Sequence, residues 1–282
     1  MAIRTDLALE QSQMVGVCDG IISENINFGK TQIDRVEVKT WAAAEKLGKP
    51  VGNYVTISFN KFSPEDNMGE LHSAIKTELL ALLPQNLNLV LVVGLGNRQI
   101  TPDALGPKTV AGVLATRHIS TAIAKEIGLE GLKPVACIMP DVLGNTGIEA
   151  AEQIYATTQK IKPDAVIVID ALAARSIERL GNTVQISNSG INPGAGVGNS
   201  RPEISQNTLG VPVVALGVPT VVDVASFAED LYNKEYSNTL GEKMMVTPRD
   251  IDELINNASS VLAVAINSAL QPNIEKEVLL NL

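Results

Sequence analysis

The chain has 282 residues, of which 45% are hydrophobic, 19% charged and only 3% aromatic, and its formal net charge is −9. This composition excludes a disordered chain and predicts a core of Val, Ile, Leu and Ala, as in buried parallel sheets. The acidic balance, without any cluster of Lys and Arg, argues against direct binding to nucleic acid.

Cysteine usage and hydropathy indicate the compartment. Cys18 and Cys137 belong to no C-x-x-C pair, which predicts two reduced thiols instead of a zinc or redox site. Charged side chains within residues 1–10 exclude a signal peptide there. No apolar stretch reaches the roughly 20 residues of a membrane span. We therefore expect a cytoplasmic protein with no membrane partner.

The N-terminal quarter is the least regular part of the sequence. Glycines interrupt short runs over residues 7–70, and this pattern predicts a β-rich appendage. The runs 35–40 and 54–57 alternate with the period of two that is typical of strands. Apolar side chains then recur at helical spacing over 70–83, which predicts a helix.

From residue 88 onward, strand patterns alternate with helix patterns. The expected strands are 88–93, 134–138, 165–169, 183–187 and 212–216. The expected helices are 107–127, 148–161, 222–233 and 248–269. Strands that alternate with helices predict an α/β fold, with a mostly parallel sheet flanked by helices. We expect residues 7–282 to form a single domain.

Two of the expected strands lead to an aspartate. Asp103 follows the first strand and a glycine turn, and Asp170 follows the strand 165–169. In open α/β sheets, ligands bind at the carboxyl ends of the strands. Two neighbouring carboxylates do not both ionise easily, so one activates water while the other donates a proton. The sequence thus predicts a two-carboxylate site, although any one such aspartate is alternatively a helix cap or turn residue.

Other residues support or limit this interpretation. Asp141 and Asp223 also follow apolar runs and are candidates of second rank. The only histidines are His72, expected on a helix surface, and His118, expected as a structural residue within a helix. A Ser-His-Asp or Cys-His site is therefore hard to build, and H-E-x-x-H is absent. Proton transfer in a hydrolase of this composition falls to carboxylates.

Two glycine-rich loops invite other interpretations. Gly94-Leu95-Gly96 follows a strand, but the dinucleotide fingerprint needs Gly or Ala where Gln99 stands, so that motif fails. The loop 189–199 contains four glycines. Such a loop is either a tight structural turn or a backbone surface for a peptide or an anion. Composition does not choose between these two.

Seven stretches of the chain match a single family, in the family's own order, at 3–10, 93–97, 101–107, 145–149, 169–176, 190–199 and 210–223. They resemble the germination protease of spore-forming bacteria, an endopeptidase that degrades small acid-soluble spore proteins. The resemblance implies a fold similar to hydrogenase maturation proteases and an atypical acid protease that needs no metal or cofactor. It also implies a cytoplasmic location in the forespore or spore core.

The resemblance assigns roles to individual positions. The family's two essential aspartates fall on Asp103 and Asp170. The family is a homotetramer made as a zymogen, and a cut at Asp6–Leu7 would release residues 1–6 as a short propeptide. We interpret these residues near the two aspartates as substrate-binding: Gly96, Asn97, Gly194, Gly196, Gly198, Asn199 and Arg175.

The chain departs from the family pattern at two places. Asp141 stands where the family has a glycine, and the stretch between Asp230 and Met244 lacks the long insertion of Bacillus members. Two further functions stay open. One is a nickel-dependent peptidase of the hydrogenase maturation type, which the scarcity of histidines disfavours. The other is a catalytically inactive binding relative, which Asp141 and the short propeptide motivate.

Overall fold

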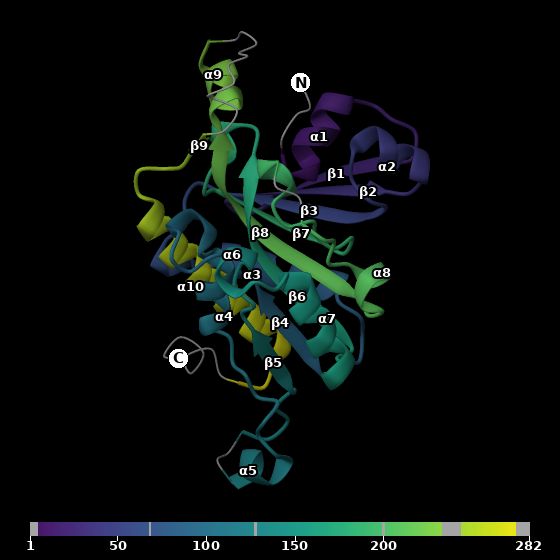
Figure 1. Cartoon of the computed structure of the whole chain (residues 1–282), viewed down its shortest axis with the longest axis vertical. Helices are drawn as coiled ribbons and strands as arrows, with labels where there is room; N and C mark the ends of the chain where they lie inside the picture. The colour runs from purple at the N-terminus through teal and green to yellow at the C-terminus, as the bar shows by residue number, and fades with distance from the viewer. Residues whose placement is uncertain (1–4, 68, 127–128, 199–200, 233–243, 275–282) are drawn as a thin grey trace.

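The computed structural model describes residues 5–67, 69–126, 129–198, 201–232 and 244–274 (Figure 1). Its strands are β1 (Ile21–Phe28), β2 (Thr31–Val38), β3 (Gly52–Ser58), β4 (Val90–Gly94), β5 (Val135–Ile138), β6 (Ala165–Ala174), β7 (Thr183–Ser187), β8 (Val213–Asp223) and β9 (Met245–Val246). Its α-helices are α1 (Ala8–Val15), α2 (Trp41–Leu47), α3 (Glu70–Leu82), α4 (Leu105–Ala111), α5 (Thr121–Glu126), α6 (Leu143–Thr146), α7 (Ala150–Ile161), α8 (Gln206–Leu209), α9 (Val224–Tyr232) and α10 (Ile251–Leu270).

The strands form one sheet in the order β1-β2-β3-β7-β8-β6-β4-β5, and β9 pairs with β8. Strands β5, β4, β6 and β8 are parallel to their neighbours within this group. The predicted α/β class is confirmed. The predicted β-rich N-terminal region is present as β1, β2 and β3, and β3 pairs antiparallel with β7, so this region extends the same sheet. The sheet is therefore mixed.

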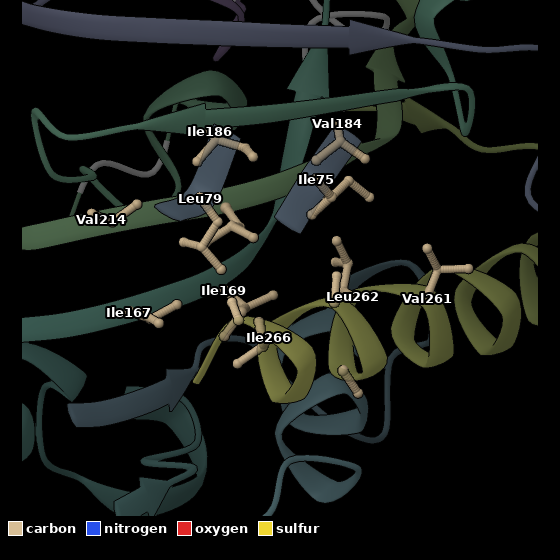
Figure 2. Close-up of a cluster of buried hydrophobic side chains, with 14 of the residues drawn as sticks. Ile75, Leu79, Ile167, Ile169, Val184, Ile186, Val214, Val261, Leu262 and Ile266 are labelled. Carbon is tan, nitrogen blue, oxygen red and sulfur yellow. The ribbon is translucent and has the colours of Figure 1, made fainter. Parts of the chain in front are cut away.

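Helices cover both faces of the sheet. On one face, α3, α4 and α10 bury the largest apolar cluster, in which Ile167 and Ile169 of β6 lie near Leu262 and Ile266 of α10 (Figure 2). On the other face, α7 and α8 pack over Val166 and other residues of the parallel strands. Alternate residues of β6 are thus buried on opposite faces, which explains why its sequence is a continuous apolar run.

The same second face carries the N-terminal helices. Helices α1 and α2 pack over Val36, Val38 and Tyr54 of β2 and β3, to one side of the parallel strands (Figure 1). Helices α3, α7 and α10 confirm the predicted helices at 70–83, 148–161 and 248–269. Helix α9 confirms most of the helix predicted at 222–233, whose last residue lies outside the described part of the chain.

The helix predicted at 107–127 is wrong as one element. Helix α4 ends at Ala111, and α5 begins only at Thr121. Between them the chain turns to pair with β5: the backbone N–H of Thr116 donates to the Val135 carbonyl at 2.9 Å, and the Thr116 hydroxyl accepts from the Val135 N–H at 3.0 Å. His118 consequently lies in an exposed turn and not within a helix.

His72 was expected at the surface, and this prediction is also wrong. Helix α3 packs against α10, so the side chain of His72 is buried, with Nε2 3.0 Å from the Ser268 hydroxyl oxygen. Both cysteines are free thiols, as predicted. Within the described ranges, no helix combines the length and the apolar character needed to cross a membrane.

Strands β6 and β8 are longer than predicted, and this difference shapes the molecule. β4 pairs with β6 only as far as Gly94 opposite Ile169, whereas β6 and β8 stay paired as far as Ala174 opposite Val222. The two strands support each other beyond the end of β4. Asp170 therefore lies inside a strand, and not in the loop that the sequence suggested.

A close backbone approach holds α4 against the ends of β4 and β6. A Cβ atom added at Gly106 would lie 2.3 Å from the Leu95 carbonyl oxygen and 2.5 Å from the Ile169 carbonyl oxygen. Real Cβ atoms do not come so near to backbone atoms, so only glycine fits at this position. The first turn of α4 is thereby fixed directly after Asp103.

We expect Gly106→Ala to lower the free energy of unfolding by about 1–3 kcal/mol, because the added methyl must push α4 away from the strands. Thermal unfolding followed by circular dichroism measures this loss. Gly144→Ala is the matched control, since nothing lies within 4 Å of the added Cβ there. Equal stability of the two variants would contradict the close packing of α4.

Candidate active site

A cavity of about 580 Å³ opens beyond the carboxyl end of β4, beside the extension of β6. The order of the parallel strands reverses here, because β4 leads outward to β5 and the chain then returns to β6 on the other side of β4. This is the position at which open α/β sheets bind ligands. Five carboxylates line the cavity, those of Asp6, Asp103, Asp141, Glu149 and Asp170.

Asp103 ends η2 (Thr101–Asp103), the short turn between β4 and α4. Its carboxylate accepts a hydrogen bond from the backbone N–H of Asn97 at 2.8 Å. Gly96 makes this approach possible, because it has a φ of 108° and a Cβ there would lie 2.0 Å from the Asp103 carbonyl oxygen. The predicted substrate-binding pair Gly96 and Asn97 therefore lines the cavity and also shapes the loop that carries Asp103.

Asp170 projects from β6 on the face that carries α7 and the N-terminal segment. It is the first residue of β6 beyond the last β4 partner, and its partner on β8 is Gly217, which has no side chain. The side chain is nearly fully buried, and the backbone N–H of Ala171 donates to it at 2.9 Å. The predicted pair, Asp103 and Asp170, thus meets in one cavity.

The N-terminal segment lies along β6 at this site. The Asp6 N–H donates to the Ala173 carbonyl at 2.9 Å, and the Ala173 N–H donates to the Asp6 carboxylate at 2.8 Å. The Gly196 N–H, from η4 (Ala195–Val197), also donates to this carboxylate. A side chain at Gly196 would collide with Asp6, since the added Cβ would lie 2.2 Å from its carboxylate.

The residues that follow Asp6 are anchored equally firmly. Leu7 is completely buried among Leu172, Ala174 and Val222. The carboxylate of Glu10, in the first turn of α1, accepts the backbone N–H groups that follow β6, at 2.8 and 2.9 Å. The predicted cleavage position Asp6–Leu7 is therefore a packed part of this face.

Asp141 contributes a further carboxylate from the loop after β5. Its φ of 64° lies in the left-handed region, which favours glycine but which Asp tolerates better than most residues. Its carboxylate accepts from the Val142 N–H at 2.7 Å and from the Asn145 amide at 3.0 Å. These bonds stabilise an aspartate at a position where the family pattern has a glycine.

Other predicted residues are distributed unevenly around the cavity. Gly194 lines it, whereas Gly198 has a φ of 71° and ends η4 outside its lining. The Arg175 guanidinium lies 3.7 Å from both Glu229 and Asp230 of α9, and Asp223 caps α9 through Ser226, so neither side chain lines the cavity. Asn199 falls outside the described residues.

Sequence reasoning missed several residues at this site. Arg201 lines the cavity and pairs with Glu149 at 3.3 Å. The sequence predicts a cleavage position at Asp6, and the structure also places its carboxylate in the cavity of Asp103 and Asp170. No sequence pattern predicts a role for Lys49 and Gln185, which contact Asp6. These contacts join segments far apart in sequence, and no local pattern in one chain signals them.

Burial and repulsion between carboxylates raise the pKa values of the aspartates in the cavity. Burial raises the pKa of Asp170 well above its usual value, and the neighbouring Asp103 and Asp6 carboxylates raise it further. Burial also raises the pKa of Asp103, with a contribution from Asp141 that the Asn97 N–H opposes. Burial raises the pKa of Asp6, against the stabilising effect of Lys49 and two backbone N–H groups. The cluster therefore retains protons more readily than isolated aspartates do.

The site contains carboxylates and backbone donors, and neither histidine lines it. Among the described residues, no group of three or more His, Cys, Asp or Glu side chains is arranged to hold a metal ion. The chemistry that these groups can carry out directly is proton transfer to and from water and a leaving group.

Comparison with known proteins finds relatives that match this chain over most of its length. Residues 3–234 match the family described as germination protease. The chain is 40% identical to the germination protease of Clostridium tetani, over 98% of each protein, and 35% identical to that of Bacillus cytotoxicus, over 98% of this chain and 95% of that protein. The alignment with the Bacillus protein spans 355 positions, so that protein contains residues with no counterpart here.

Among solved structures, a [NiFe] hydrogenase maturation protease HycI from Thermococcus kodakarensis matches 68% of this chain and 98% of its own. The identity is 16% and the TM-score is 0.41.

We expect Asp170→Asn to stabilise the protein at neutral pH. The pKa of Asp170 is higher in the folded than in the unfolded state. Its contribution to the free energy of unfolding is therefore greatest at low pH and is lost as the pH rises toward the folded-state pKa. Asparagine has no such loss, and the gain is about 1.4 kcal/mol for each unit by which the pKa is raised. Urea unfolding at pH 4 and at pH 7.5 should show the larger gain at pH 7.5.

Asp164→Asn is the control of opposite sign for this measurement. Asp164 accepts the backbone N–H groups of Asn88 and Leu89, and these bonds lower its pKa. Its replacement should therefore reduce stability at neutral pH. A lower stability of Asp170→Asn at pH 7.5 than at pH 4, relative to the parent chain, would contradict the buried-charge account.

Proposed function

This chain belongs to the germination protease family, and from that premise we propose that it is an endopeptidase that degrades small acid-soluble spore proteins during spore germination. Asp103 and Asp170 activate the water that attacks the peptide bond. The observation that carries this proposal is their shared cavity beside the extension of β6, which is already lined by an extended peptide segment of the chain itself.

The environments of the two aspartates support distinct roles. Asp170 is the more deeply buried, and two neighbouring carboxylates raise its pKa, so it holds the proton and donates it to the leaving nitrogen. Asp103 is only half-buried, so it ionises more readily than Asp170 and removes a proton from water. No cofactor or metal is part of the proposed mechanism.

The proposal includes processing of the N-terminus. Cleavage of Asp6–Leu7 would release residues 1–6, of which only Thr5 and Asp6 lie in the described part of the chain. Support comes from the contact of Asp6 with the cavity that holds both aspartates. Residues 7–282 then form a single peptidase domain, and the continuous sheet from β1 to β5 supports that division.

The glycine loop takes part in substrate binding. The N–H of Gly196 already binds the Asp6 carboxylate, which favours the peptide-binding interpretation of this loop over a purely structural turn. Gly194 lines the cavity, whereas Gly198, Asn199 and Arg175 remain assigned to substrate binding on the resemblance alone. A homotetrameric state and a location in the cytoplasm of the forespore or spore core are likewise proposed from family membership.

We expect Asp103→Asn and Asp170→Asn each to abolish cleavage of a small acid-soluble spore protein, because each removes one partner of the proton transfer. Purified full-length protein is incubated with that substrate, and fragments are identified by mass spectrometry. Asp252→Asn, an exposed aspartate on α10, is the control that should cleave normally. Normal cleavage by both active-site variants would refute the two-carboxylate mechanism.

Two other results of that experiment would favour the remaining functions. Cleavage that requires added nickel would favour a peptidase of the hydrogenase maturation type. Tight binding of the spore protein without any cleavage, at several pH values, would favour an inactive binding relative.

We expect Asp141→Asn to shift the acidic limb of the pH–rate profile toward lower pH. The Asp141 charge raises the pKa of Asp103, so removing that charge allows Asp103 to ionise at lower pH. Asparagine keeps an acceptor for the Val142 N–H and tolerates a positive φ. Initial rates between pH 4 and 9 test this, with Asp252→Asn as the control; a shift toward higher pH would contradict it.

A further inference from the structure

The carbonyl oxygen of Asp6 is held by two side chains from distant parts of the chain. The Lys49 ammonium donates to it at 3.0 Å and the Gln185 amide donates to it at 2.9 Å. Lys49 follows the end of α2 and Gln185 lies in β7. This oxygen belongs to the peptide bond between Asp6 and Leu7, the bond whose cleavage is proposed above.

The remaining atoms around this bond are also fixed. The Asp6 N–H is bonded to Ala173 of β6, its carboxylate is bonded to the backbone of Ala173 and Gly196, and the Leu7 side chain is completely buried. Directly after the bond, the Ala8 N–H donates to the Gln185 amide oxygen at 2.7 Å. The peptide bond is therefore held in a single orientation, and its carbonyl oxygen faces two donors.

Asp6 separates two cavities. On one side lies the cavity of about 580 Å³ that contains Asp103 and Asp170. On the other lies a smaller cavity of about 110 Å³ that Lys49 and Gln185 line. Asp6 therefore borders both the cavity of the proposed proton-transfer groups and the cavity of the carbonyl-binding groups.

The surroundings of Lys49 disfavour the charged form of its side chain. Burial lowers the pKa of its ammonium, against the stabilising effect of the Asp6 and Glu10 carboxylates. Burying a cation is costly unless it is compensated by hydrogen bonds and opposite charge. A positively charged donor directed at a backbone carbonyl is, by contrast, the device by which enzymes stabilise the charge that develops on that oxygen.

We propose that Lys49 and Gln185 bind the carbonyl oxygen of the peptide bond that is cleaved, first at Asp6–Leu7 and then in the protein substrate. The inference rests on the proposed function. Water adds to the carbonyl carbon while Asp103 takes its proton, and the C=O electron pair moves to the oxygen, where both side chains stabilise the negative charge. The charge then returns, the C–N bond breaks, and the nitrogen takes its proton from Asp170.

The test compares self-cleavage of the full-length chain in Lys49→Met and Gln185→Glu. Lys49→Met removes the charged donor, and Gln185→Glu replaces the second donor but keeps an oxygen for the Ala8 N–H. Loss of one such donor typically lowers the rate by about 10²-fold. Mass spectrometry over time should show at least that loss in Lys49→Met, with partial recovery in Lys49→Arg, which keeps a charged donor.

Controls separate this role from a structural one. Lys46→Met removes an exposed lysine from the last turn of α2 and should process at the parent rate. Thermal unfolding establishes that each variant is folded; if Lys49→Met does not fold, Gln185→Glu decides. With a small acid-soluble spore protein as substrate, kcat should fall while KM changes less than about threefold, because the donors act on charge that appears only in the transition state.

The outcomes distinguish this inference from the proposed function. Parent rates of self-cleavage and substrate cleavage in both folded variants, with no activity in Asp103→Asn, would overturn the role of Lys49 and Gln185 and leave the peptidase assignment intact. Absence of any cleavage by the parent chain would overturn both. A rise in KM with unchanged kcat would also overturn it, since that result indicates ground-state binding alone.

Discussion

The unequal length of the central strands is the constraint on which the rest of this structure depends. β6 and β8 continue together past the end of β4. Beyond Ile169, the edge of β6 that faced β4 therefore has no neighbouring strand. Asp170 and Leu172 project from that extension, and the N-terminal segment covers it. The cavity, its aspartates and the anchored Asp6–Leu7 bond all follow from this overhang.

The cluster of carboxylates beside the overhang is held together at a cost. Burial raises the pKa of Asp6, Asp103 and Asp170, and the neighbouring Asp103 and Asp6 carboxylates raise that of Asp170 further. Backbone N–H groups of Asn97, Ala171, Ala173 and Gly196 compensate for this effect, and Lys49 also does so at Asp6. Buried carboxylates with raised pKa values reduce the stability of the folded protein, and they are typical of functional sites.

Local patterns predicted much of the fold and the central pair of the site. The apolar runs identified β4, β5 and the first half of β6, because a strand buried on both faces needs apolar residues at every position. Asp103 and Asp170 were found because each follows such a run. The end of β6 was misjudged because Asp170 interrupts the apolar run, although pairing with β8 continues the strand through it.

What the sequence could not supply were the contacts between distant segments. Helix periodicity continued through Gly112, but pairing of the loop around Thr116 with β5 ended the helix early. The junction of the N-terminal strands with β7 depends on pairing across more than a hundred residues. The approach of Lys49 and Gln185 to Asp6 is of the same kind, since each of the three residues is unremarkable in its own neighbourhood.

The tethered position of residues 5–7 has a consequence for any peptide that binds along the extension of β6. A segment of the same chain competes at an effective concentration set by its attachment to α1, and this concentration does not fall when the protein is diluted. An incoming peptide must outcompete that segment by its own contacts or wait for its removal. The fraction of molecules in which residues 5–7 occupy the extension of β6 is thus independent of the protein concentration.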